Sequence, residues 1–334
     1  MNKKKSVVVL GGGTGIYAIL RGLKQHNDTI ETVAVVTMSD SGGSTGRLRD
    51  EFGQLPMGDV RMALVALARE SNDQDQLLRS LFLHRFNKGK GLVGHNFGNL
   101  LIVALTEIIG DEASAVEAAS RLLEIHGKVL PVTTDQVHLV AEYDDGKVVK
   151  GEHRIDEPPK NRRGKRIINL RSEPQGKITN IAERAILSAD LIVLGPGDLY
   201  SSLISILVID GVSEAIRKSS GKFLYNVNLM TRMGQTDNFT LFDHVTEVAK
   251  YTGREPDFVS FNTAPIDGSL LGQYETEFQY PVKDDGKEIT GEKIKLDLLS
   301  QKIGRQRNGD KIKRSLVRND SEKFAQMILK ILSR

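Results

Sequence analysis

Apolar positions in this chain fall into two patterns that alternate along its length. Short runs that are nearly continuous in apolar residues occur at 6–10, 30–37, 191–194 and 223–227, as in strands buried on both faces of a parallel sheet. Between them lie segments such as 16–23, whose apolar residues recur every three or four positions and so predict amphipathic helices. Strands that alternate with helices predict an α/β fold, doubly wound, with a mostly parallel, Rossmann-like sheet.

Residues 137–166 depart from this alternation. Val137–Tyr143 has the composition of a strand, and the turn signal at Asp144–Lys147 after it predicts a β-hairpin. Asp156–Arg166 is rich in proline and basic residues, and we expect an exposed, solvated loop because no aromatic residues interleave with the charges. We therefore expect one Rossmann-like nucleotide-binding domain over residues 1–334, with a hairpin and basic-loop excursion at about 137–166.

The first apolar run leads directly into a glycine cluster. Glycine lets the backbone approach an anion, and the helix that follows offers free N–H groups and the positive end of its dipole. The strict dinucleotide motif G-x-G-x-x-G fails, because Ile16 or Ala18 stands at its third glycine, and only the relaxed form with Ala18 is met. The pattern favours a phosphate site, with a ligand-free turn as the alternative, at Gly11, Gly12, Gly13, Thr14 and Gly15.

The second strand feeds another glycine-rich loop. Asp40 lies 29 residues past Gly11, which is late for the acidic residue that binds ribose in an NAD site. An acid with hydroxyls and arginines around it suits Mg²⁺ plus phosphate better. The alternative is an Asx-turn in which Asp40 only caps local N–H groups. The candidates in this loop are Asp40, Ser41, Gly43, Ser44, Thr45 and Arg47.

A third transition from strand to glycine follows residues 191–194, and it would place Gly195, Gly197 and Asp198 at the same edge of the sheet. Three such loops on one edge are stronger evidence for a ligand than one. Asp59 begins a further helix, where it is either a second carboxylate of the site or only an N-cap.

Two amides and an imidazole lie close together at the start of an apolar helix, at His95, Asn96 and Asn99. Buried polar groups are costly unless they meet partners or a ligand, so this cluster favours a binding site over a satisfied core histidine.

The end of the chain adds a basic candidate. Ser315–Val317 has a strand-like composition and Glu322–Leu332 predicts a last helix, which leaves Arg318 at a junction where an arginine can meet a phosphate. Asn228 follows the strand at 223–227 and so belongs to the same predicted edge.

Composition excludes several classes of protein. The net charge of +3 comes from scattered basic residues, which argues against nucleic-acid binding. The chain has no cysteine and therefore no disulfides or thiolate metal sites, as in a reducing compartment. Apolar runs such as Leu100–Leu105 are far too short for a membrane span, and the apolar residues after Lys3–Lys5 are too few for a signal peptide. We expect a cytoplasmic protein.

Five motifs, in order along nearly the whole chain, resemble the 2-phospho-L-lactate transferase-like (CofD-like) family. Within it the chain is most similar to the bacterial gluconeogenesis factor (YvcK-type) branch. The motifs that carry the resemblance are Gly11–Gly15, Ser39–Gly46, Gly58–Arg61, His95–Asn99 and Gly195–Tyr200.

The resemblance implies roles for several residues. The transferase branch moves a phospholactyl group from a nucleotide diphosphate donor to a deazaflavin alcohol with Mg²⁺, so Asp40 and Asp59 would be catalytic or metal-binding carboxylates. The phosphate cradle would be Gly11–Gly15 with Ser44, Thr45 and Arg47. The bacterial branch is instead associated with cell shape and growth on gluconeogenic carbon sources and binds UDP-sugars, which implies that Arg318 contacts the UDP-sugar.

Two functions therefore stay open: a UDP-sugar-binding regulatory protein, and a Mg²⁺-dependent transferase of a phosphoryl-linked group. NAD(P)-linked oxidoreduction is weaker, because Tyr143 and Lys147, the one Tyr-x-x-x-Lys pair, span the predicted hairpin turn. The segment at 228–236 only partly matches the transferase family, which weakens the acceptor side of a transferase site. We expect a homo-oligomer, with a dimer as one candidate, and further protein partners whose nature the sequence does not give.

Overall fold

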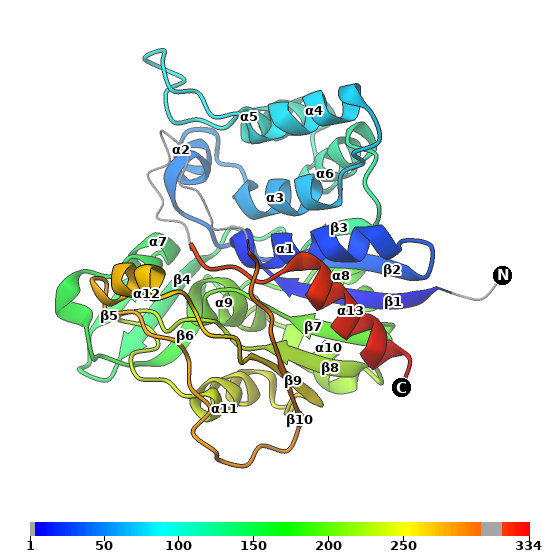
Figure 1. Ribbon diagram of the computed structural model, residues 1–334. Coiled ribbons are helices and arrows are strands. Elements are labelled where there is room, and N and C mark those ends of the chain that lie inside the picture. The colour runs from blue at the N-terminus through cyan, green and yellow to red at the C-terminus, as the bar shows by residue number, and fades with distance from the viewer. Residues whose placement is uncertain (1–3, 302–315) are drawn as a thin grey trace.

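The computed structural model describes residues 4–301 and 316–334, and within them the chain forms one large parallel sheet (Figure 1). Each neighbouring pair of strands in this sheet is parallel, which confirms the predicted α/β fold. The seven strands, in their order across the sheet, are β10 (Glu292–Leu296), β9 (Phe258–Asn262), β8 (Lys222–Asn226), β7 (Leu191–Leu194), β1 (Lys5–Gly11), β2 (Ile30–Val36) and β3 (Lys128–Pro131).

The order of the strands reverses at β1. The chain moves outward from β1 through β2 to β3, and then returns to place β7 on the other side of β1. Such a reversal opens a crevice beyond the carboxyl ends of the two central strands, where doubly wound sheets bind ligands. The apolar runs that predicted β1 and β7 are fully buried, from Val7 to Leu10 and from Leu191 to Leu194.

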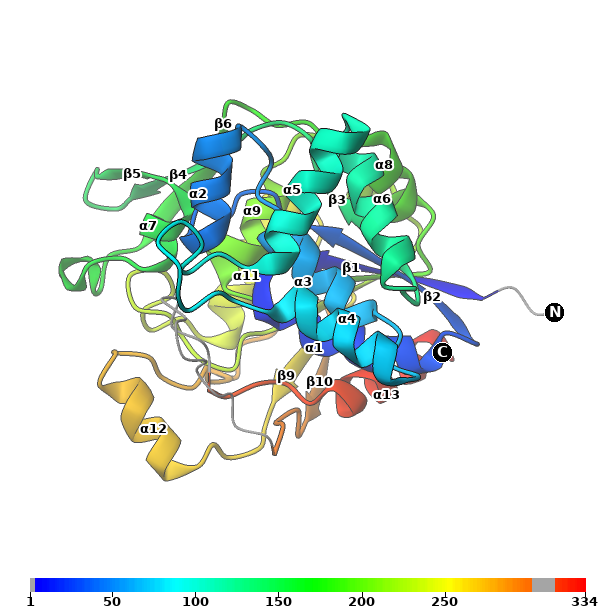
Figure 2. The same cartoon turned by 90° about the horizontal axis from the view of Figure 1, so that it is seen from above.

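Helices cover both faces of the sheet. On one face α1 packs against α3 and α13, and a further helical layer lies over α3 (Figures 1 and 2). The helices of this side are α1 (Gly13–Leu23), α3 (Gly58–Leu67), α13 (Ser321–Leu332), α4 (Asp73–Leu83), α5 (Phe97–Ile109) and α6 (Glu112–Leu122). The other face carries α8 (Asn180–Leu187), α10 (Val212–Lys218) and α11 (Leu241–Thr252). Across residues 4–301 and 316–334, no helix combines the length and apolar character needed to cross a membrane.

The excursion is larger than the predicted hairpin. β4 (His138–Tyr143) pairs antiparallel with β5 (Val148–Lys150) and, on its other side, with β6 (Ile167–Glu173). Because β6 spans Ile167–Glu173, the excursion extends beyond residue 166, and Ile167 and Leu170 of this strand are buried in the core. How many domains the chain forms stays a prediction.

The basic segment inside the excursion is exposed over most of its length, as expected, but one of its arginines is buried and anchored. Arg162 is buried, its guanidinium lies 5.0 Å from the ring centre of Tyr143, and it forms an ion pair with Asp145 at 3.1 Å. The Asp145 carboxylate and the Tyr143 ring offset the cost of burying the Arg162 guanidinium.

Shorter elements complete the described chain: a 3₁₀ turn (Lys24–His26), α2 (Gly43–Phe52), α7 (Glu152–Asp156), a 3₁₀ turn (Lys160–Arg162), a wide helical turn (Leu199–Ile204), α9 (Ser205–Leu207) and α12 (Gly268–Glu275). The strand expected at 315–317 is not observed, since Ser315 lies outside the described residues and Leu316 and Val317 form a bend. An isolated bridge instead joins Leu299 to Asn319.

Close packing of α1 on α13 makes Gly22 a sensitive position. A Cβ atom there would run into the backbone carbonyl of Ser321. We expect Gly22→Ala to lower the free energy of unfolding by about 2 kcal/mol, because added volume forces the two helices apart. Gly272 in α12 is the matched control, since no atom of the described residues outside its own helix lies within 4 Å of its Cβ position. Urea denaturation should show Gly272→Ala unchanged or stabilised, and equal losses in both variants would contradict this packing account.

Candidate functional site

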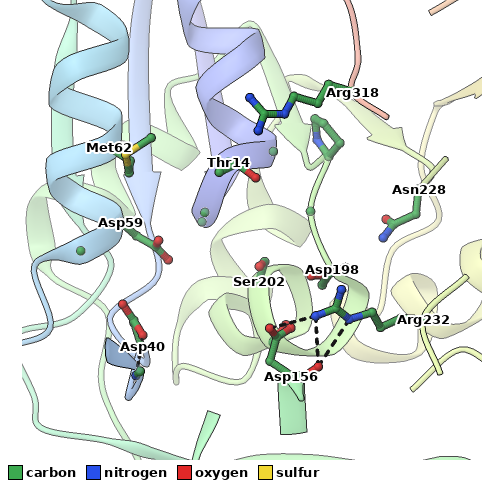
Figure 3. Close-up of a pocket in the computed structure, with 18 of the residues that line it drawn as sticks. Thr14, Asp40, Asp59, Met62, Asp156, Asp198, Ser202, Asn228, Arg232 and Arg318 are labelled. Atoms are coloured by element: carbon green, nitrogen blue, oxygen red, sulfur yellow. Dashed lines mark hydrogen bonds and ion pairs between the residues drawn. The ribbon is translucent and has the colours of Figure 1, made fainter. Parts of the chain in front are cut away.

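A cavity of about 440 Å³ opens at the carboxyl ends of the central strands (Figure 3). Its volume lies within the range of small-molecule sites. Many residues proposed from the sequence line it: Gly12, Gly13, Thr14, Gly15, Asp40, Ser44, Thr45, Asp59, Asn99, Gly197, Asp198, Asn228 and Arg318. Others lie behind or beside this wall without lining the cavity: Gly11, Ser41, Gly43, Arg47, His95, Asn96 and Gly195.

The first glycine loop forms one wall and begins α1. Gly12 is the N-cap of α1. Because glycine has no side chain, it cannot accept a hydrogen bond from the first N–H groups of the helix. A Cβ on Gly15 would run into the carbonyl of Pro196, and a Cβ on Gly12 would meet the carboxylate of Asp59. The loop therefore lies tightly against both the third glycine loop and α3.

The second loop is shorter than the glycine pattern indicates, because α2 already begins at Gly43. The Gly42 amide donates to Asp40 Oδ1 at 2.8 Å, which is the Asx-turn considered as an alternative. Asp40 also lines the cavity, and its Oδ2 lies 2.7 Å from where a Cβ on Gly58 would stand. Asp40 therefore closes an Asx-turn through Oδ1 and still lines the cavity.

Asp40 and Asp59 form a pair of carboxylates at the bottom of the cavity. Asp59 is the second residue of α3, whose N-cap is Met57, so it does not act as the N-cap. Burial, and then the charge of Asp40, raises the pKa of Asp59 to about 7, against the lowering effect of a hydrogen bond from the Gly13 amide. Burial also raises the pKa of Asp40.

A divalent cation would relieve the repulsion between these two carboxylates. Within the described residues no three His, Asp or Glu side chains are arranged to hold a metal ion. Mg²⁺ usually takes one or two carboxylates and completes its shell with water and phosphate oxygens. Asp40 and Asp59 would fit as the two carboxylates, and water and ligand oxygens would complete the shell.

The sequence did not predict the acidic side chains that α7 adds to the cavity. Glu152 accepts a hydrogen bond from the Ser41 amide at 3.3 Å, and the His153 amide donates to Ser41 Oγ at 3.0 Å, so α7 is docked on the second loop. Burial and the charges of Asp40 and Asp156 raise the pKa of Glu152 well above its ordinary value. The only local signal was the spacing of Glu152 and Asp156, four residues apart on one helix face.

Arg232 is the second feature missed by the sequence reading, and it holds the far end of α7. Its Nη2 donates to Asp156 Oδ2 at 3.1 Å and to the Asp156 carbonyl at 3.2 Å (Figure 3). Ser201 Oγ donates to Asp156 Oδ1 at 2.9 Å. Burial raises the pKa of Asp198 to about 6, and the charge of Arg232 lowers it. Arg232 thus lies between two carboxylates of the cavity.

The polar cluster at the start of α5 braces the first turn of α2, directly after the second loop. His95 Nδ1 and Ser44 Oγ share a hydrogen bond at 3.3 Å, and the Asn96 amide donates to the same oxygen at 3.2 Å. Asn96 is the N-cap of α5, and Asn99 Oδ1 accepts from Arg61 Nε at 2.7 Å. Only Asn99 of the predicted cluster reaches the cavity wall.

The two arginines that were expected to meet phosphate lie in different places. Arg47 is exposed on α2, does not line the cavity and donates to the Val93 carbonyl at 3.1 Å. Arg318 lines the cavity, and in Figure 3 its guanidinium extends on the side of Thr14, at the start of α1. Asn228 lines the same cavity from the loop after β8.

Comparison with known proteins agrees with this fold. Residues 7–303 match the model of the family described as 2-phospho-L-lactate transferase CofD. The chain is 37% identical to the gluconeogenesis factor of Bacillus subtilis, over 99% of each chain. It is 41% identical to the gluconeogenesis factor of Halalkalibacterium halodurans, over 84% of each chain. A crystal structure of a UPF0052 family member from Bacillus halodurans superposes with a TM-score of 0.88 at 36% identity, covering 98% of this chain and 100% of that one. The chain belongs to the 2-phospho-L-lactate transferase CofD family.

Proposed function

We propose that this protein binds a nucleotide diphosphate sugar, specifically a UDP-sugar, and acts as a regulatory gluconeogenesis factor. The observation that carries the proposal is the meeting of the α1 N-terminus and Arg318 on one cavity at the switch point of the sheet. N–H groups at a helix start together with a guanidinium form a site for a diphosphate. The names of relatives that share the whole length of the chain support the regulatory role.

The opposite end of the cavity suits the sugar. Asp40, Asp59, Glu152 and Asp156 face it with carboxylate oxygens, which accept hydrogen bonds from hydroxyl groups. In the proposed setting the protein is cytoplasmic, forms a homo-oligomer, and passes the level of a cell-wall precursor to protein partners that govern cell shape and central carbon metabolism.

A thermal-shift screen tests the binding proposal. UDP-sugars should raise the melting temperature, because a ligand that binds only the folded state stabilises it. Isothermal calorimetry then gives the affinity with and without Mg²⁺. Tight binding of NADPH without binding of any UDP-sugar would reject the proposal in favour of a redox enzyme.

A Mg²⁺-dependent transferase is the second candidate, favoured by the paired carboxylates Asp40 and Asp59. These two side chains would hold the ion, which when bound would offset charge on the departing nucleotide. Arg318 and the backbone N–H groups of the first loop would orient the diphosphate. If Asp40→Asn keeps its UDP-sugar affinity irrespective of Mg²⁺, and the wild type turns over no UDP-sugar, this second function is rejected.

Arg318 gives the sharpest test of the site. We expect Arg318→Ala to weaken UDP-sugar binding by about tenfold or more, about 1.4 kcal/mol, because a charge-assisted contact to phosphate is lost. Arg121→Ala is the matched control, since Arg121 is exposed on α6 and pairs with Glu117. Calorimetry should leave the control unchanged, and unchanged binding in Arg318→Ala would remove this residue from the site.

A further inference from the structure

One wall of the cavity packs on an apolar cluster that is separate from the main core. It consists of α12 and residues 316–319, and is here named the C-terminal wall. Met230, Tyr274 and Val317 form a small apolar cluster of their own beneath it, apart from the main core under the sheet. The cavity lining on this side includes Tyr274, Arg318 and Asn319.

Tyr274 fastens the two parts of the C-terminal wall to each other. Its side chain is buried, and its hydroxyl oxygen accepts hydrogen bonds from the Leu316 amide at 2.8 Å and the Val317 amide at 3.0 Å. Two bonds to consecutive amides fix the backbone immediately before Arg318 and Asn319. The orientation of both side chains in the cavity therefore depends on this phenol.

Asn319 carries the unexplained polar group of the wall. It is 7% exposed and lines the cavity, and its Oδ1 has no hydrogen-bond partner among the described residues. Buried amide oxygens in folded proteins nearly always have a partner. A carboxamide also offers a donor beside its acceptor, which matches the ring N–H and carbonyl groups along the edge of a nucleotide base.

The charges of the cavity give the direction in which a nucleotide diphosphate sugar lies. The first loop and Arg318 would hold the diphosphate in the middle, and the acidic end formed by Asp40, Asp59 and Glu152 offers acceptors for the several hydroxyl groups of the sugar. The end that remains for the base is the C-terminal wall, where Asn319 is adjacent to Arg318 in the chain.

We propose that the Asn319 carboxamide recognises the uracil base, and that Tyr274 is the positioning residue that holds it there. This inference rests on the proposed nucleotide-sugar binding and assigns the base-specificity group of that site. Selectivity for the base then resides in Asn319, whereas the affinity for the diphosphate resides in Arg318 and the first loop.

Calorimetry with UDP and ADP tests the assignment, because the two probes share the diphosphate and differ in the base. We expect the wild type to prefer UDP by about tenfold or more. Asn319→Ala should reduce this preference to below about threefold while ADP binds as before. Tyr274→Phe keeps the ring and loses the acceptor, and should weaken UDP binding by about fivefold or more.

The outcomes separate this inference from the function on which it rests. Asn169→Ala, an exposed asparagine on β6, is the control and should keep the preference for UDP. Three outcomes would overturn the base assignment and leave the proposed function standing. They are equal losses of UDP and ADP affinity in Asn319→Ala, a wild type without base preference, and unchanged UDP affinity in Tyr274→Phe. A wild type that binds neither UDP nor any UDP-sugar would overturn the proposed function as well.

Discussion

Arg232→Met should destabilise the protein by about 3 kcal/mol, because it leaves two carboxylates in the cavity without their cation. Arg232 bonds Asp156 at 3.1 Å, and its charge lowers the pKa of Asp198. Removal of one partner from a buried ion pair commonly costs about 3–5 kcal/mol. We take the lower end because the two side chains of the pair are 19% and 17% exposed. Urea denaturation at neutral pH measures the loss.

The same substitution should affect the site, because Arg232 holds the end of α7. We expect UDP-sugar affinity to fall together with stability, and Arg232→Met combined with Asp156→Asn to recover part of the stability, since the uncompensated charge is then removed. Lys218→Met is the control: its ion pair with Glu214 is exposed, so it should cost less than about 1 kcal/mol. Stability within about 0.5 kcal/mol of the wild type in Arg232→Met would show that the pair is not a support of the cavity.

The sequence predicted the parts of the fold whose signals are local. An apolar run, a glycine cluster and a helical period stand next to one another in the chain, and each transition fixes a strand, a turn and a helix in order. The carboxyl ends of parallel strands share one edge, so the sequence alone places Gly12–Gly15, Ser44 and Gly197 on one side of the sheet. Those three places do line the cavity.

The remaining part of the site depends on contacts that cross long stretches of chain. Asp156 and Arg232 are 76 residues apart, and neither shows in its own neighbourhood that the other will be beside it. Arg61 is similar: next to Asp59 it could be read as solvated, yet it is buried because Asn99 accepts its hydrogen bond from 38 residues away. Contacts between polar side chains that are far apart in the chain produce no local or periodic pattern in a single sequence.

Local signals also overstated some contributions. His95 and Asn96 were expected to meet a ligand, because a buried imidazole and amide need partners. Ser44, in the first turn of α2 and 51 and 52 positions away, bonds the His95 ring and the Asn96 backbone amide. The Asn96 side chain instead accepts from the Asn99 amide as the N-cap of α5, and neither His95 nor Asn96 lines the cavity. That His95 and Asn96 contribute to ligand binding stays a prediction.

His244 should make the stability of the protein depend on pH between about 6.5 and 4. This histidine is fully buried on α11, its Nδ1 shares a hydrogen bond with the Tyr225 hydroxyl at 3.2 Å, and its Nε2 has no partner among the described residues. Burial lowers its pKa to about 4 from the ordinary 6.5, against a small opposing effect of Asp243. Within this window the unfolded chain binds a proton that the folded chain excludes.

Stability therefore falls as the pH is lowered through this window, and the full contribution of His244 is lost below pH 4. A shift of about 2.5 units corresponds to about 3 kcal/mol, of which about 2 kcal/mol is lost by pH 5. We expect His244→Gln, whose amide can still meet Tyr225 and cannot titrate, to lack this component. Urea denaturation of both proteins at pH 7.5, 6 and 5 gives the difference, in which the carboxylates of the cavity cancel. Parallel stability curves for the two proteins would mean that His244 accepts a proton in the folded state as readily as in the unfolded chain, and that Tyr225 and the surrounding core do not exclude its charge.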